Sequence, residues 1–370
     1  MNTKRKSRGK RIILGIFLTP LLLCLAGGLA SYLINRGLPT ESAQAEMLSP
    51  AAATHVREAQ QLKVELGDEV WPGFGSAGIP LMVFNERYAF LCGVEQAPPG
   101  WERAEGQPCF RGVYPNPQAF THEVGGRWFG SMTTQEYMGI RLREEISEQL
   151  PGPLAAVFPY GLITPTLGTD RYLGALVHES FHAFQAETAR PRFDDAERAY
   201  PTGDAYWVND TSAREQWKRE TQALYDALNA QDEAEMRRFA AEFLSIRAER
   251  RSQTLKDESL VLYEKRYEWL EGMAKYVELN TLLAAAHTPN YVPDATLATD
   301  KNFHDYSQID ALWKSELNQM KRQAGLEGDT RFYYTGMGQG ELLDRLMPDW
   351  KSRLFAEGVW LEDLLAEALH

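Results

Sequence analysis

The segment ALVHESFHAFQ (residues 175–185) is the most informative part of the sequence. On a helix, His178 and His182 lie on one face, one turn apart. The apolar residues before, between and after them predict that this helix is buried. Two imidazoles and the carboxylate of Glu179 buried in one place need a partner, because isolated polar groups are costly to bury. The segment therefore predicts a core helix that carries a polar site.

The spacing His-Glu-x-x-His is typical of a zinc site. Two imidazoles at positions i and i+4 can bind one Zn²⁺ through nitrogens at about 2.0–2.1 Å. Glu179, which follows the first histidine, is then placed to take a proton from water at the ion. The alternative is a helix whose histidines only donate hydrogen bonds to backbone carbonyls. The apolar flanks favour the zinc site.

A zinc site with three protein ligands needs one more donor, and a second predicted helix, 258–286, offers candidates. Its acidic residues on nearly one face are Glu264, Glu268, Glu271 and Glu278. Such a stripe is commonly a solvated face. Glu271, however, precedes Gly272 and Ala274, whose small side chains let two helices approach closely. We expect Glu271 to be the third ligand, with the two acids before it as alternatives.

Together, HESFH (178–182) and EGMA (271–274) resemble the gluzincin metallopeptidases, which include thermolysin-like and aminopeptidase-like enzymes. The resemblance implies that His178, His182 and Glu271 are zinc ligands and that Glu179 is the general base. It covers these two segments only. The long insert between them, 190–257, is predicted to be an additional helical excursion, and the chain looks like a bacterial membrane-anchored branch of this group.

The segment RFYYTGMGQGE (331–341) is the third candidate element of the site. Zinc hydrolases need a donor that stabilises the oxyanion, and Tyr333 or Tyr334 could supply it. The sequence slightly favours a structural role instead, in which the tyrosines pack the start of a helix and the glycines form a turn. His304 is a further candidate donor.

The N-terminus combines a basic tail with an uncharged, apolar run. The basic residues are Lys4, Arg5, Lys6, Arg8, Lys10 and Arg11. The run 12–34 reaches roughly 34 Å as a helix, enough to cross a bilayer core. It predicts a single-pass membrane protein with a cytoplasmic N-terminus and an extracytoplasmic catalytic part, in the periplasm or at the cell exterior. The alternative is a cleaved signal peptide that ends near Ala43-Gln44-Ala45. Cys92 and Cys109 are predicted either to form a disulfide outside or to remain two buried thiols.

The sequence divides into parts of different character. They are a basic tail (1–11), the anchor (12–34), a tether and helix (35–66), a small α/β portion (67–169) and a helical zinc-hydrolase portion (170–370). In the α/β portion, the runs 79–85 and 88–94 predict a hairpin and 155–163 a further strand. The expected fold class is α+β, mainly helical and zincin-like with a small N-terminal sheet, preceded by one transmembrane helix.

The net charge of −12 disfavours nucleic acid as a partner, because a phosphate backbone would be repelled. The predicted function is that of a membrane-anchored zinc metallopeptidase that hydrolyses a peptide or protein substrate. Two alternatives remain: a non-catalytic anchored binding or assembly protein with a structural zinc site, and a zinc amidase that acts on a cell-wall component. The sequence indicates no oligomeric state.

Overall fold

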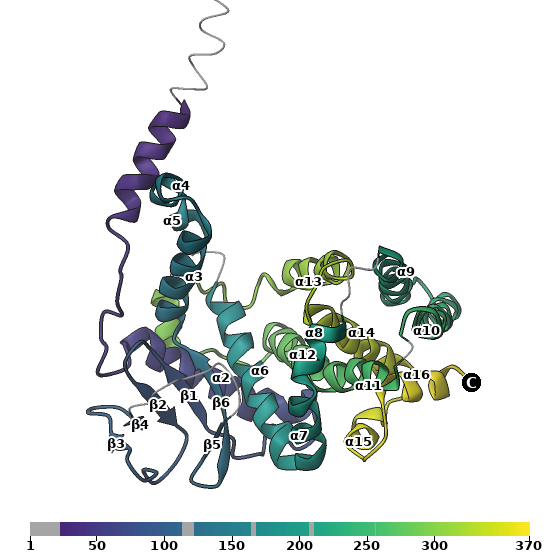
Figure 1. Cartoon of the computed structure of the whole chain (residues 1–370). Helices are drawn as coiled ribbons and strands as arrows, with labels where there is room; N and C mark the ends of the chain where they lie inside the picture. The colour runs from purple at the N-terminus through teal and green to yellow at the C-terminus, as the bar shows by residue number, and fades with distance from the viewer. Residues whose placement is uncertain (1–22, 113–121, 164–167, 207–210, 256) are drawn as a thin grey trace, which may run out of the picture.

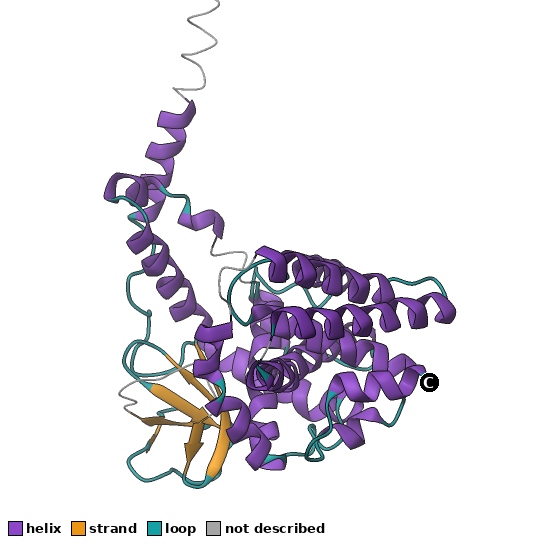
Figure 2. Ribbon diagram, turned by 45° about the vertical axis from the view of Figure 1, so that its right-hand side comes forward, coloured by secondary structure: helices purple, strands orange, loops and turns teal. Residues whose placement is uncertain are grey.

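The computed structural model describes residues 23–112, 122–163, 168–206, 211–255 and 257–370. A helical body makes up most of the molecule, and a small twisted sheet lies at one side of it (Figures 1 and 2). This arrangement matches the predicted mainly helical α+β class with an N-terminal sheet.

The sheet has the order β3-β4-β2-β1-β6-β5. Its strands are β1 (Leu81–Phe84), β2 (Ala89–Cys92), β3 (Glu102–Arg103), β4 (Cys109–Gly112), β5 (His122–Val124) and β6 (Arg127–Thr133). The predicted hairpin is present as β1 and β2, which pair antiparallel, whereas β1 pairs with β6 in parallel. Cys92 and Cys109 are opposite each other in neighbouring strands, with Cα atoms 4.3 Å apart, and form a disulfide.

Helices fill the remainder of the described chain. The first group is α2 (Pro50–Val70), α3 (Gln135–Gln149), α4 (Gly152–Val157), α5 (Tyr160–Ile163), α6 (Thr169–Thr188) and α7 (Arg190–Arg198). The second group is η2 (Tyr200–Thr202), α8 (Gly203–Tyr206), α9 (Thr211–Leu228), α10 (Glu233–Thr254), α11 (Glu258–Tyr267) and α12 (Met273–His287). The last group is η4 (Ala295–Thr299), α13 (Ile309–Gln323), α14 (Thr330–Leu346), α15 (Trp350–Leu354) and α16 (Leu361–Leu369). Between α11 and α12 the chain forms a single π-helical turn, η3 (Glu268–Gly272).

Helix α6 is the centre of the fold, because it packs on β6, α2 and α12. Its contact with the sheet is a backbone contact at Gly130. A Cβ added there would lie 2.7 Å from the carbonyl carbon of Glu179 and 2.7 Å from the amide nitrogen of Ser180. Only glycine allows this approach, so the sheet directly supports the segment that carries the histidines.

The predicted membrane anchor is wrong: no helix among the described residues is long and apolar enough to cross a bilayer. Residues 12–22 of that segment lie outside the described ranges. Its described part lies in a helical stretch over 23–35. The single-pass localisation, with a cytoplasmic N-terminus and an extracytoplasmic catalytic part, depended on this anchor and is corrected with it.

Two local predictions also differ from the structure. The expected strand over 155–163 is replaced by the short helices α4 and α5, because Pro151 and Gly152 begin a helical turn there. Residues 212–251 of the predicted helical excursion, whose sequence predicts one long or kinked helix, form two helices, α9 and α10, which pack against each other. Asp232 is the N-cap of α10, and its side chain accepts a hydrogen bond from the Glu235 amide, so a new helix begins there.

Candidate metal centre

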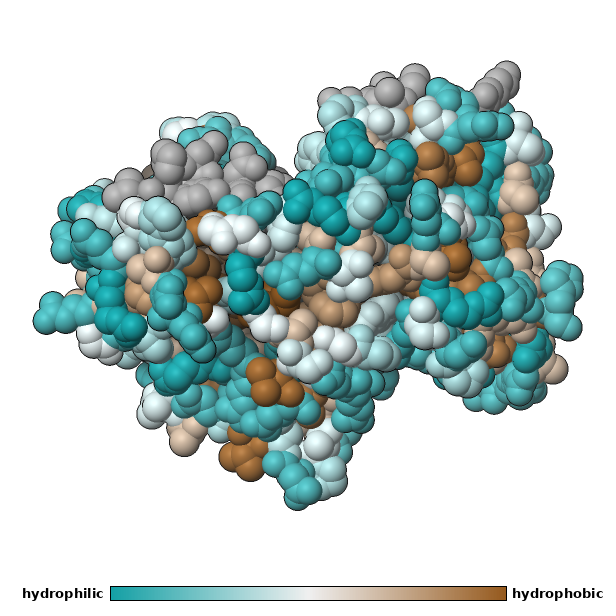
Figure 3. Space-filling view, turned by 90° about the horizontal axis from the view of Figure 1, so that it is seen from below, coloured by the Kyte–Doolittle hydropathy of each residue, from teal (hydrophilic) through white to brown (hydrophobic). Residues whose placement is uncertain are grey.

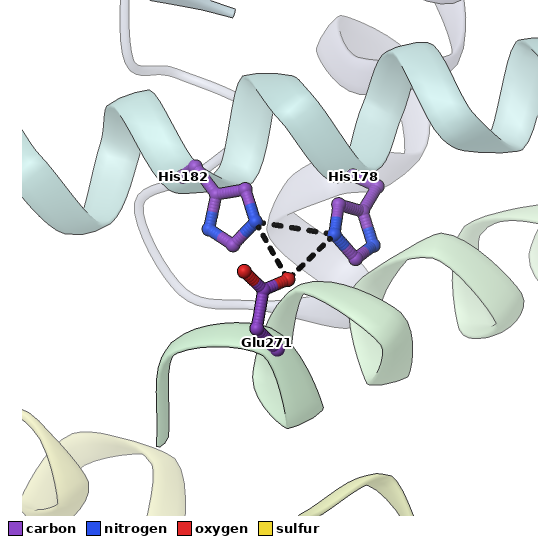
Figure 4. A group of neighbouring side chains, drawn as sticks. All are labelled: His178, His182 and Glu271. Carbon is purple, nitrogen blue, oxygen red and sulfur yellow. Dashed lines mark hydrogen bonds and ion pairs between the residues drawn. The ribbon is translucent and has the colours of Figure 1, made fainter. Parts of the chain in front are cut away.

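His178 and His182 project from the same face of α6, as the spacing predicts (Figure 4). Their ring centroids are 4.8 Å apart, and their Nε2 atoms face each other at 3.1 Å. The helix holds them in the core, because Val177 and Phe181 beside them are completely buried. Two ring nitrogens this close share at most one proton between them, so the arrangement favours a cation at that point.

Glu271 of the turn η3 reaches the same point from the opposite side (Figure 4). Its Oε2 atom lies 3.4 Å from Nε2 of His178 and 3.2 Å from Nε2 of His182. Ligands at about 2.0–2.1 Å from a tetrahedral zinc ion are themselves roughly 3.4 Å apart. The separations of these donor atoms therefore fit one shared zinc ion, with the fourth position left for another ligand.

The other nitrogen of each histidine has its own partner. Nδ1 of His178 lies 3.2 Å from Oε2 of Glu278, and Nδ1 of His182 lies 3.0 Å from Oε1 of Gln185. Both partners accept a hydrogen bond, so they hold the proton on Nδ1 and leave the Nε2 lone pair directed at the shared point. Glu278 is in turn paired with Lys275, at 2.7 Å.

The sequence alone predicts no role for Gln185 and indicates Glu278 only as part of an acidic stripe. The spacing contained a signal for both, since Gln185 is three residues after His182 and Glu278 is two helical turns after Glu271. Gln185 has a second contact, because its Nε2 donates to the backbone oxygen of Trp269 at 2.8 Å and of Leu270 at 3.2 Å. The Gln185 side chain therefore joins α6 to the π-helical turn that carries Glu271.

Close packing of two glycines sets the position of this turn. A Cβ added to Gly272 would lie 2.5 Å from Cα of Gly336 in α14, and one added to Gly336 would lie 2.5 Å from the backbone oxygen of Glu268. The predicted close approach at Gly272 is therefore present. The glycines of segment 331–341 do not form a turn, as one interpretation expected, but lie inside α14.

The alternative third ligands, Glu264 and Glu268, lie in a different environment. Glu264 accepts hydrogen bonds from Arg250 and Arg251, and Glu268 accepts from Arg247 at 2.9 Å. Both carboxylates are buried and matched by guanidinium groups. The structure brings neither of them to the histidines.

Glu179 has a buried Oε2 atom that makes no hydrogen bond in the described part of the chain. Burial raises the pKa of its carboxyl to about 8, and the charges of Glu271 and Glu278 act in the same direction, against the opposing effect of His182. A carboxyl group with a free oxygen and a pKa near neutrality is suited to accept and return a proton.

The two tyrosine candidates point to different places. The Tyr333 ring is stacked on the His178 ring, with centroids 5.8 Å apart, and its hydroxyl interacts with Glu271. Tyr334 instead donates to Glu316 at 3.2 Å. Of the pair, Tyr333 lies at the metal centre. His304 pairs with Asp170 at 3.4 Å, and the structure does not bring it into the histidine cluster.

The charges of the centre depend on one another. Burial, the largest single effect, would lower the pKa values of His178 and His182, but the hydrogen bonds and charges of the carboxylates around them together raise them. Burial would likewise raise the pKa of Glu271, but the two histidines lower it far below its ordinary value. The same side chains that stabilise a proton here can stabilise a divalent ion in its place.

The chain was compared with known protein families, curated proteins and solved structures. No family model, no curated protein and no solved structure matches the chain, so its function is inferred from the site itself.

Proposed function

We propose that the chain is a zinc-dependent hydrolase of peptide bonds. The observation that carries this proposal is the convergence of two Nε2 atoms and one carboxylate oxygen beside a fourth side chain, Glu179, whose buried oxygen has no partner among the described residues. A purely structural zinc site has no need of such an acid, and such sites are usually closed by four protein ligands.

The roles follow from where each group lies. His178, His182 and Glu271 hold the ion, and the chemistry supplied by zinc at such a site is Lewis-acid polarisation of a carbonyl group. Glu179 takes the proton from the attacking water and returns it to the leaving amine. Tyr333, whose hydroxyl interacts with Glu271, would turn that hydroxyl to donate a hydrogen bond to the oxyanion that forms on the former carbonyl.

The test separates metal binding from catalysis. Wild type, Glu179→Gln and His182→Ala are compared by metal analysis and by hydrolysis of a mixed peptide library, with and without a zinc chelator. We expect one zinc per chain in wild type and in Glu179→Gln, loss of zinc in His182→Ala, and a fall in turnover of about 10²–10⁴-fold in Glu179→Gln.

A matched control is Glu187→Gln, a substitution of the same kind on the same helix, at a side chain that is 33% exposed and only loosely paired with Arg127. It should retain full turnover. Full activity in Glu179→Gln would contradict the role of the base. Zinc bound without hydrolysis of any peptide would favour a structural zinc site instead.

A further inference from the structure

Lys275, in α12, is a lysine whose side chain is largely withdrawn from water, with only 13% of it exposed. Hydrophilic residues ordinarily lie at the surface, as they do over most of the face in Figure 3, and a lysine is rarely buried unless it is paired. Its Nζ atom lies 2.7 Å from Oε1 of Glu278 and 3.0 Å from Oε2 of Glu316. The ammonium group therefore bridges two carboxylates.

Glu316, in α13, holds the other side of this lysine. Its side chain is only 4% exposed. Its Oε2 atom also accepts a hydrogen bond from the hydroxyl of Tyr334 at 3.2 Å, and its Oε1 atom lies 3.1 Å from Nη1 of Arg171. Three side chains thus bind one buried carboxylate, which compensates its removal from water and fixes its position. Lys275 is therefore anchored on a carboxylate that is itself fixed.

These contacts form a ring that begins and ends on α6. Arg171 and His178 both belong to α6, about two turns apart, and so lie on one face of it. From Arg171 the ring passes to Glu316 of α13 and on to Lys275 of α12. Glu278 closes it, because its Oε2 atom lies 3.2 Å from Nδ1 of His178. Helix α12 packs on both α6 and α13, so the ring follows an interface of three helices (Figure 1).

The two histidines differ in what holds their hydrogen-bond partners. Gln185, the partner of His182, is fixed by backbone oxygens of the turn η3. Glu278, the partner of His178, is held by Lys275 instead. The lysine occupies Oε1 of this carboxylate and leaves Oε2 for the imidazole. Because a carboxylate can rotate and exchange its two oxygens, the lysine sets the direction from which the ring of His178 is held.

We propose that Lys275 is a positioning residue of the metal centre. Its ammonium group fixes the Glu278 carboxylate, which in turn holds the His178 ring with Nε2 directed at the ion. Lys275 itself is not a ligand and acts only through these two side chains. The inference rests on the proposed function, since it concerns the ion of the same centre, but metal binding alone tests it.

The test is a double-mutant cycle on metal affinity. Wild type, Lys275→Met, Glu278→Gln and the double variant are compared by their Kd for Zn²⁺, from competition with a chromogenic chelator, and by the visible absorption of the Co²⁺-loaded protein. Urea denaturation of the metal-free proteins gives the free energy of unfolding. Lys265→Met is the matched control, because this lysine of α11 is 19% exposed and is paired with Glu362 at 2.8 Å.

We expect Lys275→Met to weaken zinc binding about three- to tenfold, less than the roughly 10–100-fold typical of a ligand's direct partner. With Glu278→Gln already present, the same substitution should weaken it less than about twofold, because it acts through this carboxylate. Lys265→Met should destabilise the fold but keep the zinc affinity of wild type. Of the two lysine variants, only Lys275→Met should change the Co²⁺ absorption, which depends on the geometry of the ligands.

Glu316→Gln is a second variant that decides if Lys275→Met does not fold. The amide still offers an acceptor to Lys275 but removes the charge that anchors it. Zinc affinity should therefore fall about two- to threefold, and this fall should disappear when Glu278→Gln is also present.

Equal zinc affinity in wild type and Lys275→Met, or in wild type and Glu316→Gln where the first does not fold, would overturn the inference. An equal loss with and without Glu278→Gln, or an equal loss in Lys265→Met, would overturn it as well, since the effect would then not pass through Glu278. Absence of peptide hydrolysis by the zinc-loaded wild type would refute the proposed function, and the affinities would still decide on Lys275. A wild type that binds neither metal would refute both.

Discussion

The first and the second part of one helical run, which comprises α11, η3 and α12, use the same residue type in opposite ways. Glu264 and Glu268 are buried and have guanidinium groups as partners. Glu271 and Glu278, further along the run, have imidazoles as partners. Arginine keeps its charge at all accessible pH values, whereas an imidazole can exchange its proton for a metal ion.

The difference shows how an acidic stripe should be interpreted. The first pair belongs to a closed network, in which Arg247 also binds Glu220 and Glu362 at 2.8 and 3.1 Å. The second pair lies beside Glu179, whose buried oxygen has no partner in the described chain. The arginine network stabilises the fold, and the histidine cluster is suited to bind a ligand. The predictions below test that separation.

The largest effect is expected from Glu271→Ala, which removes one of three ligands. Zinc binding should be lost at concentrations that saturate wild type, while the metal-free protein stays folded because the arginine network is intact. Metal analysis after dialysis and circular dichroism measure the two properties. Retention of stoichiometric zinc in this variant would exclude Glu271 as a ligand.

Glu268→Ala should leave the proposed zinc ligands in place but destabilise the fold. It leaves Arg247 with one buried carboxylate fewer and removes the partner of Thr335 and Gln339, so we expect a loss of about 3–5 kcal/mol in the free energy of unfolding. Urea denaturation of the metal-free protein measures it, with Glu242→Ala on α10 as an exposed control. A loss below about 1 kcal/mol would show that the network contributes little.

Glu278→Gln tests the partner of a ligand. The amide can still accept a hydrogen bond from Nδ1 of His178 but no longer supplies a negative charge, so zinc affinity should fall about 10–100-fold. Competition with a chromogenic chelator gives the Kd. Unchanged affinity, with the fold intact, would mean that this carboxylate does not support the ligand.

The smallest effect is expected in the metal-free protein as a function of pH. The folded state holds the proton of Glu179 up to a pKa of about 8, whereas the unfolded state releases it near its ordinary pKa. The folded state therefore binds more protons in between, and stability falls as pH rises from about 4.5 to about 8. Glu179→Gln should remove the part of that fall that comes from this carboxyl and so flatten the profile.

Urea titrations at several pH values, with excess chelator, compare the two proteins. His178 and His182, whose pKa values are also raised, cause a fall in the same direction that persists in the variant. Parallel profiles for wild type and Glu179→Gln would show that this carboxyl is not held protonated.

The geometry of the cluster could largely be predicted from spacing. Helical periodicity places His178 and His182 on one face, and the small residue after Glu271 indicates the close helix packing that brings this acid to them. The π-helical turn could not be predicted, because it depends on the contact of Gly272 with Gly336, sixty-odd residues away along the chain. For the same reason, the sequence could not predict which of the two tyrosines, Tyr333 or Tyr334, lies at the histidines, since they are far from them along the chain.

Other features depend on tertiary contacts that periodicity does not show. Arginines of α10 pair with Glu264 and Glu268 and so separate these two acids from the other two of the stripe. No local sequence pattern links these arginines to either acid. The predicted anchor was inferred from hydropathy and length alone, and the described helices do not support it. Gly130 carries no sequence signal for its contact with α6, since glycines are also common in turns.

The proposed ligands His182 and Glu271 are 89 positions apart in sequence. An ion held by both would close a loop containing α7 to α11, a constraint that the unfolded chain lacks, so uptake follows the docking of α6 against the π-helical turn. Release requires the same two elements to separate. The rate at which labelled zinc exchanges would therefore measure how often the centre of the body opens.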